Sequence, residues 1–277
     1  MRILSECRSH GGVQGAYSHS SDVTGTDMTF AVFVPEHQAG ARLPVIWWLS
    51  GLTCTHENAM TKLEYRRACA EHGLIFVCPD TSPRGEYVPD QEGYDFGKGA
   101  GFYVDATEEP WARNYRMRSY VEDELPALVA EHFPVDIERQ SIMGHSMGGH
   151  GALTISLRNP RRFRSVSAFS PIASPMHCPW GEKALSGYLG EDRAAWRQYD
   201  ACALIEDGAR LDHLLVDQGR ADEFLDEQLK TWLLEKAVRK AGMMATIRLQ
   251  EGYDHSYYFL SSFIDQHIDW HADRLKA

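Results

Sequence analysis

A serine flanked by two glycines is the strongest chemical signal in the sequence. The run Gly144-His145-Ser146-Met147-Gly148 follows a short apolar stretch and opens a segment with helical periodicity. A sharp strand-to-helix turn lifts such a serine clear of the sheet and places the free N–H groups of the helix start beside it. A side chain two residues before or after the serine would collide with the neighbouring strand or helix, which explains the glycines. We therefore predict that Ser146 is the nucleophile of a serine hydrolase.

A nucleophilic serine needs a general base, and His255 is the best placed of the 13 histidines. On a fold with this kind of turn the histidine comes last in chain order, and His255 lies between the last predicted strand and the last predicted helix. His145 adjoins the nucleophile, but alternation along the strand predicts that its side chain points away from the site. His267 and His271 fall within the last helix, where we expect them at the surface.

The acid that orients the histidine should follow a strand between Ser146 and His255. Two candidates are present, Asp217 at the end of a predicted strand and Asp222 in the loop beyond it. Asp222 could instead cap the next helix, and Asp217 could anchor the turn. Position favours Asp222, because an acid a few residues beyond the strand can reach back to the histidine.

Two backbone N–H groups are expected to form the oxyanion hole. One belongs to Met147, and the other to Leu52, which follows another buried strand. Gly51 permits the unusual backbone that would aim the Leu52 amide inward. Cys54 is either a small buried filler or a thiol close enough to the site for its modification to block activity. It lacks the turn that Ser146 has, so we do not expect it to be the nucleophile.

The elements that must position these groups alternate along the chain. Strands are predicted over 28–34, 44–49, 74–78, 141–144, 164–169, 213–216 and 245–249, and helices over 62–72, 119–132, 149–157, 224–241 and 257–274. This alternation predicts an α/β protein with a mostly parallel central sheet and helices on both faces, the α/β-hydrolase fold, in a single domain covering residues 1–277. The segment 81–115 is rich in glycine and aromatic residues, and we expect an ordered loop that packs near the site.

Composition and charge indicate which partners and which cellular compartment to expect. The net charge of −11 argues against nucleic acids and anionic membrane surfaces as partners. The six cysteines have neither metal-ligand nor disulfide-scaffold spacing, so we expect free thiols in a reducing cytoplasm. The start of the sequence has no apolar segment of the signal-peptide kind, and no apolar run approaches the length of a membrane span.

Several longer runs together resemble one family, the S-formylglutathione hydrolases, also called esterase D, of the α/β-hydrolase superfamily. These runs are residues 48–54 (Trp-Leu-Ser-Gly-Leu-Thr-Cys), 78–85, 99–107, 144–152, Asp217-Gln218-Gly219 and 253–259 (Tyr-Asp-His-Ser-Tyr-Tyr-Phe). The resemblance extends over almost the whole chain, and the combination is far more specific than the serine motif alone.

The resemblance implies a cytoplasmic enzyme that hydrolyses the thioester S-formylglutathione to glutathione and formate through a formyl-serine intermediate, without a metal or organic cofactor. It implies the triad Ser146, Asp222 and His255, oxyanion donation by Leu52 and Met147, a thiol at Cys54 that makes the enzyme sensitive to thiol reagents, and a possible homodimer. A broader carboxylesterase acting on short acyl esters is the nearest alternative. A non-catalytic α/β-hydrolase module that only binds a partner is a remote one. The residues that hold the glutathione portion are left open.

Overall fold

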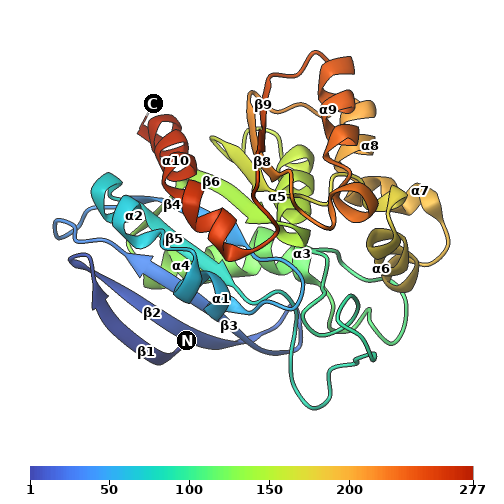
Figure 1. The fold of residues 1–277 in the computed structure, drawn as a ribbon. Helices are drawn as coiled ribbons and strands as arrows, with labels where there is room; N and C mark the ends of the chain where they lie inside the picture. The colour runs from blue at the N-terminus through green and yellow to red at the C-terminus, as the bar shows by residue number, and fades with distance from the viewer. Residues whose placement is uncertain (277) are drawn as a thin grey trace.

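Residues 1–276, which a computed structural model describes, form a nine-stranded sheet in the order β1-β2-β3-β5-β4-β6-β7-β8-β9 (Figure 1). The strands are β1 (Arg2–Ser9), β2 (Gly12–Ser21), β3 (Thr26–Val34), β4 (Leu43–Leu49), β5 (Ile75–Pro79), β6 (Val135–His145), β7 (Val166–Phe169), β8 (Leu214–Gly219) and β9 (Ala245–Gln250). From β5 to β9 all neighbours in the sheet are parallel, whereas β1, β2 and β3 are antiparallel at one edge. The prediction of a mostly parallel sheet is confirmed.

Helices cover both faces of the sheet. They are α1 (His56–Lys62), α2 (Arg66–His72), α3 (Met117–Ser119), α4 (Leu125–His132), α5 (Met147–Arg158), α6 (Pro179–Leu189), α7 (Arg193–Trp196), α8 (Ala201–Glu206), α9 (Thr231–Lys240) and α10 (Tyr257–Lys276). Alternate residues of β4 enter two separate cores. Trp48 belongs to the core that also contains residues of α1, α2 and α10, and Trp47 to the core that contains residues of α4, α5, α6, α8 and α9. A strand buried on both faces is the reason that residues 44–49 form an unbroken apolar run.

The seven predicted strands are all present, and two more precede them. No hydrophobic alternation marks β1, because seven of its eight residues are exposed and the eighth is half-buried. The helix predicted over 62–72 is wrong as one element, since the chain breaks between α1 and α2 where Glu64 has φ of 64°. The helix predicted over 224–241 is likewise divided, into a π-helical turn (Leu225–Leu229) and α9, with Lys230 between them at φ 49°.

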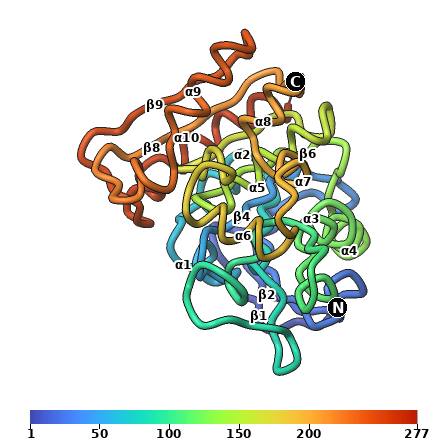
Figure 2. Tube along the Cα trace, turned by 90° about the vertical axis from the view of Figure 1, so that its right-hand side faces the viewer, coloured from blue at the N-terminus to red at the C-terminus, as the bar shows by residue number. Residues whose placement is uncertain are grey.

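The glycine- and aromatic-rich segment between β5 and α3 is an ordered loop, as expected. Phe96, Phe102, Tyr103 and Tyr115 are all buried in it. Phe96 stacks on Tyr188 of α6 with ring centroids 4.4 Å apart, and the loop lies beside α6 in both views (Figures 1 and 2). The buried aromatic residues of the loop are therefore part of the core beneath α6.

No helix within residues 1–276 is both long and apolar enough to cross a membrane.

Candidate active site

The predicted nucleophile lies on a strained turn between β6 and α5. Ser146 has φ of 56° and ψ of −119°, and it is 2% exposed. A β-carbon added to Gly148 would lie 2.0 Å from the carbonyl oxygen of Leu49, and one added to Gly144 would lie 2.3 Å from the carbonyl oxygen of Gly148. Both glycines are thus required by close backbone approach, and such strain is typical of functional turns.

The structure brings Asp222 and His255 together. Asp222 lies three residues beyond the end of β8, and His255 lies between β9 and α10. His255 Nδ1 is 2.6 Å from Asp222 Oδ2, and the carboxylate is fully buried. Asp222 Oδ1 accepts a hydrogen bond of 2.9 Å from the Phe224 N–H within the loop. The helical turn that follows (Leu225–Leu229) has no side-chain cap, so the alternative role of Asp222 as a helix cap is not observed. With Nδ1 held by the carboxylate, Nε2 is the ring nitrogen left for a substrate or for Ser146.

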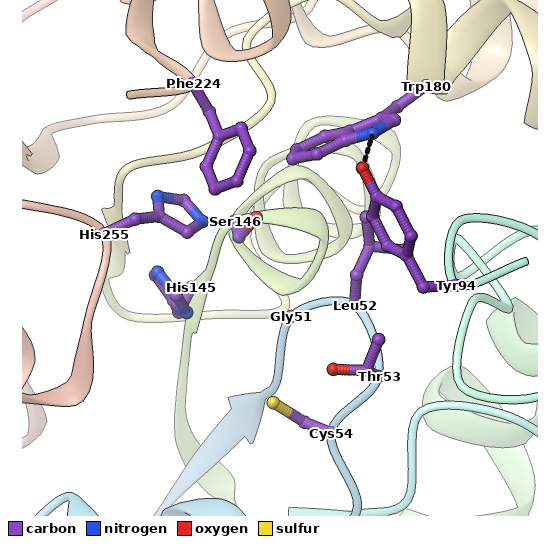
Figure 3. Close-up of a pocket in the computed structure, with 10 residues that line it drawn as sticks. All are labelled: Gly51, Leu52, Thr53, Cys54, Tyr94, His145, Ser146, Trp180, Phe224 and His255. Carbon is purple, nitrogen blue, oxygen red and sulfur yellow. Dashed lines mark hydrogen bonds between the residues drawn. The ribbon is translucent and has the colours of Figure 1, made fainter. Parts of the chain in front are cut away.

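Ser146 and His255 share one cavity of about 220 Å³. Its walls are formed by Gly51, Leu52, Thr53, Cys54, Tyr94, His145, Ser146, Trp180, Phe224 and His255. Figure 3 shows the His255 ring beside Ser146, with Phe224 and Trp180 forming an aromatic wall. Trp180 Nε1 donates a hydrogen bond of 3.1 Å to Tyr94 Oη, which ties α6 to the aromatic-rich loop at the cavity (Figure 3).

The loop after β4 lies directly over the nucleophile. A β-carbon added to Gly51 would be 3.1 Å from Ser146 Cβ, a tight contact, so glycine helps this loop to come so close. Gly51 is not among the glycines with positive φ, so the expected unusual backbone at this residue is not observed. Leu52 follows in the loop and also lines the cavity. Met147 begins α5, and the first N–H groups of a helix have no partner within it. The two predicted oxyanion donors therefore belong to segments that meet at Ser146.

Cys54 lies in the same cavity wall. It is 8% exposed, and its Sγ is 3.9 Å from the hydroxyl oxygen of Tyr257 at the start of α10. Burial raises the pKa of the Cys54 thiol, so the thiol form predominates at neutral pH. The residue adjoins the site as a weakly acidic thiol.

The expected orientation of His145 is wrong. Its side chain lines the cavity, and its ring centroid is 4.5 Å from that of His255 (Figure 3). Alternation fails here because His145 is the last residue of β6 and the turn at Ser146 redirects the chain. Both ring nitrogens of His145 are buried without a hydrogen-bond partner, and burial holds its pKa well below the usual value. A neutral imidazole thus packs against His255.

The alternative acid, Asp217, lies within β8, and its hydrogen-bond partners differ from those of Asp222. Its carboxylate contacts His267 Nε2 at 2.9 Å, Gln250 Nε2 at 2.8 Å and the guanidinium of Arg248. Burial opposes ionisation, but the hydrogen bonds from His267 and Arg248 outweigh it and lower the pKa of Asp217 to about 2. Asp217 is therefore an ionised anchor between β8, β9 and α10.

The expectation that His267 and His271 lie at the surface is wrong as well. Both are completely buried and belong to a continuous hydrogen-bonded row, which we call the polar row. From Asp217 it runs through His267, Ser167, His271, Ser165 and Ser141, with successive contacts of 2.9, 2.9, 2.8, 2.7 and 2.7 Å. The polar row joins α10 to β6, β7 and β8, the strands that lead to Ser146 and Asp222.

Sequence reasoning missed two residues, one that contacts the predicted acid and one that supports this contact from behind. Gln218 donates a hydrogen bond to Asp222 Oδ2, and Thr231 donates one to Gln218. Among residues 1–276, no group of three His, Cys, Asp or Glu side chains is placed to hold a metal ion.

Comparison with known proteins identifies the family. Residues 21–270 match the family model described as "Putative esterase". An S-formylglutathione hydrolase of Paracoccus denitrificans is 54% identical over 272 residues, which cover 98% of this chain and 97% of that protein. The chain belongs to the S-formylglutathione hydrolase family. In structure it is similar to an S-formylglutathione hydrolase of Agrobacterium tumefaciens, with a TM-score of 0.98, 57% identity, and coverage of 99% of this chain and 100% of the other.

More distant structures share the fold with this family member. A fluorophosphonate-binding serine hydrolase of Staphylococcus aureus matches with a TM-score of 0.76 at 18% identity, over 94% of this chain and 98% of the other. At that identity the likeness concerns the arrangement of strands and helices alone.

Proposed function

We propose that this protein hydrolyses S-formylglutathione to glutathione and formate. The observation that carries the proposal is the 2.6 Å contact between His255 and the buried carboxylate of Asp222, with His255 in the same cavity as Ser146. Support for this thioester comes from the relative in Paracoccus denitrificans, which bears that name at 54% identity.

The geometry supports acyl transfer in two steps. Ser146 Oγ attacks the thioester carbonyl carbon while His255 Nε2 takes the hydroxyl proton, and Asp222 holds the imidazole in the required tautomer. The N–H groups of Leu52 and Met147 stabilise the oxyanion, each by about 3 kcal/mol. The C–S bond then breaks, and His255 passes the proton to the departing thiolate, so that glutathione leaves as the thiol. Water, losing its proton to the neutral His255, attacks the formyl-serine ester. His255 then returns this proton to Ser146 Oγ as the ester bond breaks and formate leaves.

The size of the cavity supports a small acyl group. A volume of about 220 Å³ is below the range of roughly 300–1,000 Å³ in which a whole drug-sized ligand is enclosed. A cavity of this size has room for the formyl group and the adjoining part of the thioester, but not for the whole tripeptide. Tyr94, 55% exposed, lies at the rim of the aromatic wall.

For the cellular setting, we propose a cytoplasmic enzyme that acts on a small molecule, binds neither nucleic acid nor membranes, and forms a homodimer. The net charge of −11 supports the exclusion of nucleic acids and anionic membranes as partners, because it disfavours polyanions. Size-exclusion chromatography with light scattering measures the oligomeric state directly.

The function is tested by comparing kcat/KM for S-formylglutathione with kcat/KM for short-chain aryl esters. We expect the thioester to be the better substrate and activity on aryl esters to fall steeply beyond acetyl or propionyl. An aryl ester preferred by tenfold or more would make the protein a general carboxylesterase. Labelling of the folded protein by a fluorophosphonate, lost in Ser146→Ala, distinguishes an enzyme from a module that only binds.

A further inference from the structure

The carboxylate of Asp222 has a side-chain partner besides His255. Gln218, which is completely buried in β8, donates from Nε2 to Asp222 Oδ2 over 3.1 Å. This is the same oxygen that faces His255 Nδ1. The amide therefore acts on the atom that must receive the imidazole N–H.

A glutamine amide can help or harm a carboxylate, depending on which end faces it. Here Nε2 contacts two groups that only accept hydrogen bonds, Asp222 Oδ2 and the carbonyl oxygen of Gly219 at 3.1 Å. The other end, Oε1, receives the hydroxyl of Thr231 at 2.7 Å, and Thr231 is 3% exposed. Every polar atom of the amide is satisfied in this orientation, whereas the reverse would oppose Oε1 to a carboxylate.

The position of Thr231 comes from a break in the chain. Lys230 adopts a left-handed conformation, with φ 49° and ψ 45°, between the π-helical turn and α9. Thr231 is the first residue of α9, so its hydroxyl is delivered to Gln218 by the start of that helix. A continuous helix over 224–241 would place this side chain elsewhere.

We infer that Gln218 is a positioning residue for the catalytic acid and that Thr231 holds the other end of its amide in place by donating to Oε1. The inference rests on the proposed function, in which Asp222 is the acid of the triad. Three donors then hold one buried carboxylate: the Phe224 N–H on Oδ1, and Gln218 and His255 on Oδ2. Such an arrangement preorganises Asp222 to stabilise the imidazolium that forms as Ser146 attacks.

Conservative substitutions at Thr231 test the inference. Thr231→Ser keeps the hydroxyl, and we expect kcat within twofold of wild type. Thr231→Val keeps the shape but removes the donor, and we expect kcat to fall about tenfold with KM within twofold, the effect of leaving the buried Gln218 Oε1 without its donor. Thr154→Val is the matched control, because Thr154 is equally buried and its hydroxyl bonds only to backbone carbonyls; we expect its kcat to be unchanged.

A double-mutant cycle separates positioning from general stability. Gln218→Met should lower kcat by about tenfold or more in the wild type and have little effect in the Asp222→Asn background, because the interaction it removes is already lost there. Equal losses in both backgrounds, or equal kcat for Thr231→Val and Thr231→Ser, would overturn the inference. All rates are measured on a short-chain aryl ester as well as on the thioester. A wild type that hydrolyses neither substrate would refute the proposed function instead.

Discussion

Mild acid is expected to destabilise this protein, because three histidines that contact no carboxylate are buried inside it in the neutral form. His145, His150 and His271 are completely buried, and burial is the main cause that lowers their pKa values, for His150 to about 4. In the unfolded chain a histidine has a pKa of about 6.5. Between pH 7 and 5.5 the unfolded state therefore takes up protons that the folded state does not.

The magnitude follows from proton linkage. Each such histidine goes from about one-quarter to about nine-tenths protonated in the unfolded chain over this range, which costs slightly more than 1 kcal/mol of stability. Three give about 4 kcal/mol, a large part of the 5–15 kcal/mol that is typical of a folded domain. Burial raises the pKa of Asp80 and Glu122, so these two carboxyls gain protons preferentially in the folded state and offset some of the loss.

Urea unfolding at pH 7.0, 6.5, 6.0 and 5.5 measures the effect. His150→Gln keeps a donor for the Phe102 carbonyl oxygen, which His150 Nε2 contacts at 2.9 Å, and removes one titrating site. We expect the loss between pH 7 and 5.5 to be about 1 kcal/mol smaller in this variant, whatever its stability at pH 7. His10→Gln, at an exposed position, is the matched control and should leave the loss unchanged. An unfolding free energy independent of pH over this range would refute the reasoning.

Three further outcomes are expected. Asp222→Asn should lower kcat about 10⁴-fold by stabilising the wrong imidazole tautomer, whereas Asp217→Asn should cost far less activity and mainly stability; equal losses in kcat would reopen the choice of acid. A bulky thiol reagent should inactivate the wild type, slowly at neutral pH because the pKa of Cys54 is raised and faster at higher pH, and should spare Cys54→Ser; unchanged sensitivity in the variant would place the effect on another cysteine. Gly148→Ala should fail to form the turn, since its methyl group would lie 2.0 Å from the Leu49 carbonyl oxygen, as seen in a lowered melting temperature and lost fluorophosphonate labelling; a normally active variant would contradict the crowding argument.

The proximity of residues that directly follow parallel strands could be predicted from the sequence. Ser146, Asp222 and His255 follow β6, β8 and β9, and the carboxyl ends of parallel strands meet at one edge of the sheet, so their proximity follows from topology. Gly144 and Gly148 could be read as markers of close approach because nothing larger fits such a turn.

What could not be predicted depends on partners far away in the sequence. His271 in α10 is buried because Ser165 and Ser167, more than 100 residues earlier, supply its hydrogen bonds. Helical periodicity alone cannot reveal such a pairing. Gln218 and Thr231 were missed for the same reason, since an amide and a hydroxyl carry no catalytic signature until the break at Lys230 brings them together.

All hydrogen bonds of the polar row donate in the same direction, toward the ionised Asp217 at its end. Ionised Asp217 accepts a hydrogen bond from His267 Nε2, so the Nδ1 of neutral His267 must accept one from Ser167, which in turn accepts one from His271 Nε2. The same logic continues through Ser165 to Ser141, leaving each group one permitted role. Because the charged end does not allow the row to reverse, replacing one member by a residue of the opposite hydrogen-bonding character would oppose two donors or two acceptors. These six positions are therefore expected to change together among relatives or not at all, and their substitutions should be strongly non-additive.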